Sequence, residues 1–272
     1  MSIEQCRRRF AWACQHLELL NSSLAPLREA YAYPPLRVEH KDGGCRRQWA
    51  LDPDADLPPV DPALGLIFGD CLHNFRATLD NLIYSLSELH CRRLLTPDEA
   101  NRPFFPIAGY KTDFRKARRR GAIAYLPARV QARVQRLQPY KTEEEPEWHP
   151  LSILRELSDR DKHRFALIGI GTPSHHSYVY EPGVQGRYIA NILEPGTPFF
   201  ELVVPPHLAK VDMQVNLSFA ISLKEPARLR GRDAYYWLND IRACISDAVF
   251  PELEVDPILT DSSVNPSFAK VY

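Results

Sequence analysis

The sequence lacks an excess of charge of either sign, a long apolar run and a signal-like start. Lys and Arg number 34 and Asp and Glu number 34, so the zero net charge excludes a generally basic DNA-coating protein. No stretch reaches the roughly 18 apolar residues of a membrane-spanning helix, so we expect no membrane segment. The first 20 residues contain no continuous apolar segment, so we expect no secretory signal and a cytoplasmic protein.

Several catalytic and metal-binding motifs are also missing. The six cysteines form no C-x-x-C pair, so we expect free thiols and neither zinc knuckles nor thioredoxin-type chemistry. The sequence contains no G-x-S-x-G, no H-E-x-x-H, no G-x-G-x-x-G after a strand and no glycine-rich phosphate loop. No short motif therefore names a reaction, and function has to be argued from side-chain clusters.

The composition is that of a globular protein, with 44% hydrophobic and 25% charged residues. It excludes a disordered tail, a collagen-like repeat and a coiled coil. Ser2 and Gln5 predict a capping-box start, and apolar spacing predicts a first helix from there to about Arg28. Asp61-Pro62 predicts the start of a second helix of roughly 30 residues, over 61–95. On the second helix one apolar arc is formed by Phe68, Leu72, Phe75, Leu79, Leu82, Ile83 and Leu86. Between the two helices, residues 36–51 predict a β-hairpin.

Shorter helices are predicted over 113–120, 127–137 and 150–163, and the pattern then changes to strands. Strict alternation over residues 211–223 is the strongest of these strand signals. A final helix is predicted over 232–250. The order indicates an α+β fold: an N-terminal helical region with one long central helix, an antiparallel sheet of about four to five strands and a C-terminal helix.

The predicted domain organisation follows from the same order. Residues 1–164 form a mainly helical region that contains the hairpin at 36–51. Residues 165–255 form the sheet and the C-terminal helix and pack with the first region as one globular unit. Residues 256–272 form a tail.

The polar face of the long helix has an unusual composition. Its members are Asp70, His73, Asn74, Ala77, Asp80, Asn81 and Tyr84, with Arg76 at the border. Arg76 and Asp80 stand four residues apart, the spacing of a side-chain pair on a helix. A solvated face is normally built from Glu, Lys, Gln and Arg, whereas Asp, His and Asn are poor helix formers that hydrogen-bond directionally. This face therefore predicts a buried polar network that fixes helix packing, a catalytic or binding surface, or an ordinary solvated face.

A second polar cluster, over residues 159–164, ends the helix that precedes the sheet. Its cations suit a helix C-terminus, which is the structural interpretation. In the functional interpretation Asp161 and His163 lie over the long helix and complete a catalytic site with the residues His73, Arg76 and Asp80. Asn74, Asn81 and Tyr84 are then candidate binding residues. Imidazole and carboxylate would suit zinc, manganese or iron, but we assign no metal ligand and leave the cofactor unknown.

Several motifs follow one another between residues 60 and 170. They are Gly69-Asp70-x-x-His73-Asn74-x-Arg76-x-x-Leu79-Asp80-x-x-x-Tyr84, Phe105-Pro106-Ile107, Leu126-Pro127, Leu137-Gln138-Pro139-Tyr140 and Asp161-Lys162-His163-Arg164. In this order they resemble a family of uncharacterised bacterial proteins that is common in actinobacteria. The resemblance implies a bacterial protein and brings no activity, because the family has none assigned.

Members of that family often carry His at the position of Asn81, which gives Arg-x4-His. This spacing is similar to the catalytic Arg-x4-6-His of HEPN-type ribonucleases, which are helical and metal-independent. The resemblance implies RNA cleavage without a metal. This chain departs from the pattern, because Arg76-x4-Asn81 lacks the histidine.

The cations are unevenly distributed along the chain. From Phe114 to Thr142 there are nine Lys and Arg and no acidic residue, and three glutamates follow at once. Arg129, Arg133 and Arg136 form one helical stripe that would suit successive phosphates. The alternative is a face neutralised by the nearby glutamates or by another acidic surface.

Two functions of different classes follow from these patterns. The first is an enzyme that acts on a phosphate-bearing small molecule or RNA, with His73 or His163 as general acid or base, Arg76 on the developing phosphoryl charge, and Asp80 or Asp161 orienting the histidine. The second is a non-catalytic binding or assembly module whose polar helix face is a structural network. The sequence leaves open whether the protein is a homo-oligomer.

Overall fold

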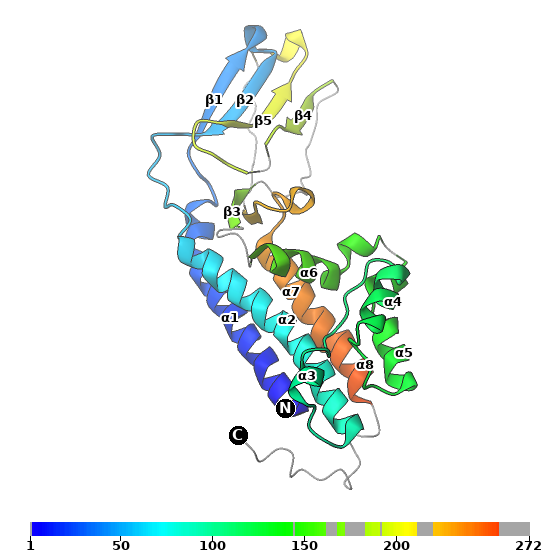
Figure 1. Ribbon diagram of the computed structural model, residues 1–272. Helices are drawn as coiled ribbons and strands as arrows, with labels where there is room; N and C mark the ends of the chain where they lie inside the picture. The colour runs from blue at the N-terminus through cyan, green and yellow to red at the C-terminus, as the bar shows by residue number, and fades with distance from the viewer. Residues whose placement is uncertain are drawn as a thin grey trace. The chain divides into compact units, whose positions relative to one another are not determined.

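The computed structural model describes residues 2–143, 145–161, 168–171, 183–190, 192–210 and 220–255 (Figure 1). The fold is an α+β mixture, as predicted. The chain divides into two compact units. The helical unit consists of Met1–Glu18, Ile67–His163 and Trp237–Tyr272, and the sheet unit consists of Leu19–Leu66 and Arg164–Tyr236.

The first and last elements of the described chain are helices (Figure 1). The helices are α1 (Ile3–Ala30), α2 (Pro62–Cys91), α3 (Pro97–Ala100), α4 (Lys111–Arg119), α5 (Ala128–Arg136), α6 (Pro150–Asp161), α7 (Ala234–Ala243) and α8 (Phe250–Glu254), with a π-helical turn at Cys244–Val249. Their starts follow the predicted capping. Ser2 and Gln5 exchange hydrogen bonds at 2.7 and 3.2 Å, and the Asp61 carboxylate accepts the Ala63 N–H at 2.8 Å.

The predicted apolar arc of α2 forms the core of the helical unit. Its members are Phe68, Leu72, Phe75, Leu79, Leu82, Ile83 and Leu86, each at most 1% exposed. The ring of Phe10 lies 5.9 Å from the ring of Phe75 and 5.4 Å from that of Phe250, which joins α1, α2 and α8. Because this burial fixes which side of α2 faces inward, it also fixes the direction of the polar face.

The sheet unit contains a four-stranded antiparallel sheet in the order β1-β2-β5-β4 (Figure 1). Its strands are β1 (Leu36–Lys41), β2 (Arg46–Leu51), β4 (Gln185–Tyr188) and β5 (Pro198–Val203); β3 (Ile168–Gly171) pairs separately with β6 (Ala220–Leu223). On one face, the rings of Trp49 and Tyr188 lie 5.6 and 5.1 Å from the ring of Phe200. This aromatic row anchors the central strands.

The hairpin at 36–51 lies in the same compact unit as the later strands, because β2 pairs with β5. The physical reason is that β2 buries Trp49 and Leu51, and an isolated two-stranded hairpin is marginally stable in water. The units therefore do not divide at residues 164 and 165 alone.

The predictions for the last strand, the tail, membrane helices and the cysteines can be compared with the described residues. The strand predicted over 211–223 is present at β6, while residues 211–219 and the tail at 256–272 lie outside the described residues. Within the described ranges, no helix combines the length and the apolar character that crossing a membrane requires. All six cysteines are free, as predicted. Burial raises the pKa of Cys71 and of Cys244 to about 12, so neither thiol is a nucleophile at neutral pH.

Candidate functional site

The polar face of α2 divides into two groups with different surroundings. Towards its N-terminal half, Asp70 and His73 share a neighbourhood with Asp161, the last residue of α6; we call these three the acid–base cluster. One turn further along, Arg76 and Asp80 bind the backbone of Phe105; we call this group the Phe105 clamp. The four predicted catalytic residues that the structure describes therefore fall into two groups.

The acid–base cluster depends on the absence of a side chain at Gly69. A Cβ built there would lie 2.7 Å from Oδ1 and 2.8 Å from Oδ2 of Asp161. Glycine inside a helix costs roughly 0.5–1 kcal/mol relative to alanine. At Gly69 the carboxylate of Asp161 lies where the side chain of another residue would be, so the helix tolerates this cost where the contact needs it.

Burial and a neighbouring charge make Asp161 easier to protonate than an ordinary aspartate. Burial raises the pKa of its carboxyl, the charge of Asp70 raises this pKa further, and His73 opposes the shift. Asp161 is half-buried, whereas Asp70 and His73 are exposed to solvent. A carboxyl with a raised pKa beside an exposed imidazole is the arrangement from which general acid–base catalysis is built.

The Phe105 clamp is closed by four hydrogen bonds. Arg76 donates from Nε and Nη2 to the two carboxylate oxygens of Asp80, at 3.1 and 2.9 Å. The same Nη2 donates to the carbonyl oxygen of Phe105 at 2.9 Å, and the Phe105 N–H donates to Asp80 Oδ1 at 3.0 Å. Because Phe105 is fully buried, these contacts satisfy peptide groups that water does not reach. For this half of the face they favour the structural network.

The carboxylates of Asp161 and Asp80 lie at different levels of α2, because Asp161 lies against Gly69. Asp80 follows Gly69 by 11 residues, which corresponds to roughly 16 Å along the helix axis at 1.5 Å per residue. His163 lies outside the described residues. Within the part of the chain that is described, no three His, Cys, Asp or Glu side chains form a group that could hold a metal ion.

The predicted binding residues on α2 have mixed surroundings. The Asn74 side chain donates to the carbonyl oxygen of Asp70 at 2.9 Å, so its amide is used within the helix. Asn81 and Tyr84 are half-buried. These positions leave their binding role a prediction.

Two arginines of the predicted stripe, Arg133 and Arg136, contact Glu252 of α8. Arg133 Nη1 donates to the carbonyl oxygen of Glu252 at 3.0 Å, and Arg136 Nε donates to its carboxylate at 3.2 Å. Arg129 is exposed. An acidic residue from a distant segment thus compensates two of the three arginines, which favours the structural alternative for α5.

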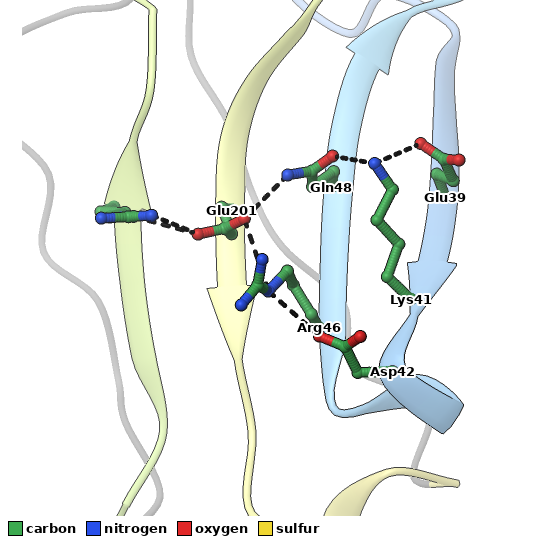
Figure 2. Close-up of polar contacts among 7 residues, drawn as sticks. Glu39, Lys41, Asp42, Arg46, Gln48 and Glu201 are labelled. Atoms are coloured by element: carbon green, nitrogen blue, oxygen red, sulfur yellow. Dashed lines mark hydrogen bonds and ion pairs between the residues drawn. The ribbon is translucent and has the colours of Figure 1, made fainter.

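A carboxylate in the sheet unit escaped the sequence-based search. Glu201 is only 3% exposed and accepts hydrogen bonds from Gln48 Nε2 at 2.7 Å and from Arg187 Nε and Nη2 at 3.0 and 2.7 Å. Figure 2 shows Glu201 facing Gln48 and Arg46 of β2, with Arg46 Nε 3.8 Å from the carboxylate. Hydrogen bonds from Gln48 and Arg187 lower the pKa of Glu201.

The same row of the sheet continues to its edge. Lys41 donates to Gln48 Oε1 at 2.8 Å and pairs with Glu39 at 3.1 Å, as Figure 2 shows. Such cross-strand pairs stabilise a sheet. Because Glu201 already accepts from several donors, we interpret this row as structural. Its one sequence signal was a glutamate inside the apolar segment 199–205.

Comparisons with protein-family models, curated proteins and solved structures gave no significant match. We therefore infer the function from the geometry of the described residues. The resemblance to actinobacterial proteins and to HEPN-type ribonucleases stays a prediction.

Proposed function

We propose that the chain is an acid–base enzyme that cleaves phosphate esters, with Asp161 and His73 as its reacting groups. The observation that carries the proposal is the raised pKa of a half-buried Asp161 held between the polar side chains of α2. A carboxyl that keeps its proton longer is suited to donate it to a leaving group. The exposure of His73 and Asp70 leaves this group open to a substrate from solvent.

The chemistry balances with these two groups alone. Neutral His73 accepts the proton of an attacking hydroxyl, from water or from a ribose, while the new P–O bond forms. Asp161 gives its proton to the departing oxygen as the ester P–O bond breaks. Proton exchange with solvent then removes the proton from His73 and returns one to Asp161, which completes the cycle.

The substrate class is argued from charge. The stretch from Phe114 to Thr142, in the same unit, carries nine cations and no acid. Glu252 pairs with two of them, Arg133 and Arg136, and the remaining excess of positive charge favours an anionic ligand. Arg76 was predicted to stabilise phosphoryl charge. Since its guanidinium donates to Asp80 and to the Phe105 carbonyl, we assign it to positioning the Phe105 segment.

A second candidate is favoured by the Phe105 clamp. Its four hydrogen bonds are those of a structural network, and a non-catalytic binding or assembly module would need nothing more from this helix face. The two candidates therefore differ in the role they give to Asp161 and His73.

The test compares two phosphodiesters with different leaving groups, bis(p-nitrophenyl) phosphate and a labelled RNA oligonucleotide. Asp161→Asn should lower RNA cleavage about 100-fold or more and the activated ester less, because nitrophenolate leaves without a proton. His73→Ala should slow both reactions.

The matched controls are Asp159→Asn, an exposed carboxylate on the same helix, and His40→Ala, an exposed histidine in the sheet unit. Both should keep turnover within about twofold of the unchanged protein, as expected for surface changes away from a site. Absence of turnover in the unchanged protein, or equal effects of Asp161→Asn and Asp159→Asn, would reject the acid–base role and favour the non-catalytic module.

A further inference from the structure

A cationic surface lies on α4 and on the residue that follows it. It is formed by exposed Lys111, Arg115, Lys116, Arg118, Arg119 and Arg120; we call it the α4 surface. Lys116 lies 3.7 Å from the carboxylate of Asp113. In the described part of the chain, the other five have no carboxylate within ion-pair distance.

A further cation reaches this surface from another segment. Gly121 has a φ of +94°, and a Cβ built on it would lie 3.4 Å from Cδ of Arg102. The Phe104 N–H donates to the Ala122 carbonyl at 3.1 Å, which holds the two segments together. The exposed Arg102 side chain therefore lies beside the C-terminal end of α4.

The cations of the α4 surface repel one another, which lowers the stability of the helix. Arg115 and Arg119, like Lys116 and Arg120, stand four residues apart, where like charges destabilise a helix. The helix macrodipole favours cations in the last turn, but it does not remove repulsion between them. On α5 the corresponding repulsion is relieved by Glu252, whereas α4 has no such partner among the described residues.

We propose that the α4 surface binds the phosphate backbone of a nucleic acid. Guanidinium groups present paired N–H donors that match phosphate oxygens, and most of these cations are arginines. Tyr110, directly before α4, is 72% exposed and offers a ring on which a base can stack. Charge complementarity with a polyanion thus comes with an aromatic contact.

A membrane surface fits these residues less well. Helices that lie on bilayers insert large apolar side chains while their cations meet the headgroups. The one large apolar residue of α4 is Phe114, which is 3% exposed and packs 6.2 Å, ring to ring, from Tyr140. No large apolar side chain of α4 is left to enter a membrane.

The inference goes beyond the proposed cleavage, because it depends on α4 and not on Asp161. The test is fluorescence anisotropy of the full chain with a labelled 20-nucleotide single-stranded RNA and a 20-base-pair RNA duplex, over about 50–200 mM KCl. R115Q/R118Q/R119Q should weaken binding of the single strand about tenfold or more. The slope of log affinity against log salt should fall by roughly 2, at about 0.7 per lost phosphate contact.

The matched control removes the same charge from another helix of the same unit. R7Q/R8Q/R9Q alters three exposed arginines of α1, of which Arg7 pairs with Glu254 and Arg8 with Glu4. This variant should change the affinity less than about twofold, since nonspecific charge loss acts weakly away from the phosphate contacts. Circular dichroism spectra should show that both variants keep the fold of the unchanged protein.

Three results would overturn the proposal: no binding of either RNA at 50 mM salt, equal losses in the two triple variants, or binding to phosphatidylserine vesicles without binding to RNA. The binding measurement needs no turnover, which separates this proposal from the proposed cleavage. If the unchanged protein binds RNA but does not cleave it, the cleavage is rejected and the binding result stands.

Discussion

Asp161 of the helical unit and Glu201 of the sheet unit are both shielded from water, yet their pKa values shift in opposite directions. Burial and the charge of Asp70 raise the pKa of Asp161. Hydrogen bonds from Gln48 and Arg187 lower that of Glu201, although Glu201 is the more buried of the two. The difference lies in the donors: a carboxylate supplied with several N–H groups is stabilised as an anion, and one beside a second acid is not.

Asp80 belongs with Glu201 in this comparison. It accepts from Arg76 and from the Phe105 N–H, and therefore has the surroundings of a structural carboxylate although it lies on the same helix as His73. Residue type and helix face did not separate Asp80 from the acid–base cluster. The donors that surround each carboxylate do, and this makes the distinction testable.

The largest effect is expected from Asp80→Ala. The substitution leaves the buried Phe105 N–H without its acceptor and Arg76 without its ion-pair partner. We expect the free energy of unfolding to fall by about 2–4 kcal/mol, measured by urea denaturation. The control is Asp56→Ala, at an exposed loop position, which should change it by less than about 0.5 kcal/mol. A similarly small loss for Asp80→Ala would remove Asp80 from the structural class.

A smaller loss is expected from Glu201→Gln, about 1–2 kcal/mol at neutral pH, because water can replace the partner of the exposed Arg187 side chain. The pKa of Glu201 is lowered, so its stabilisation is present above the ordinary value of 4.5 and is lost as the pH falls through the folded value. Urea denaturation of both proteins at pH 7 and pH 3 should show a gap that narrows in acid. A gap that widens in acid contradicts the assignment.

The sequence predicted those parts of the structure that depend on spacing along one element. The apolar arc of α2, the Ser2–Gln5 cap and the Arg76–Asp80 pair all lie within a few residues, and the structure confirms them. The carbonyl of Phe105 and the carboxylate of Glu252 reach their partners from distant segments, and no local pattern encodes those contacts.

Gly69 shows the limit of local reasoning most directly. In the sequence it only lowers the helix propensity of residues 61–95. In the structure the Asp161 carboxylate lies against Gly69, where a side chain would not fit. Glu201 was missed for a related reason, because an apolar strand gives no sign that one glutamate within it will meet Gln48 and Arg187 across two neighbouring strands.

Asp161→Asn should show the opposite pH dependence to Glu201→Gln. A raised pKa means that the folded state favours protonated Asp161, so its contribution is fully present below 3.8 and is lost as the pH rises through the folded value. The asparagine variant should therefore gain on the unchanged protein between pH 3 and pH 7. We expect less than about 1 kcal/mol because solvent screens a half-buried group, with Asp159→Asn, at an exposed position of the same helix, as the control.

The smallest effect on stability is expected from His73→Ala. A small loss of stability together with a large loss of cleavage would distinguish a catalytic from a structural role for His73. An exposed imidazole contributes little to folding, so the free energy of unfolding should stay within about 0.5 kcal/mol. Cleavage of the RNA oligonucleotide should nevertheless fall about 100-fold, as removal of a general base does. A loss of stability above 1 kcal/mol together with unchanged cleavage would place His73 with Asp80 and Glu201, and the whole polar face of α2 would then be structural.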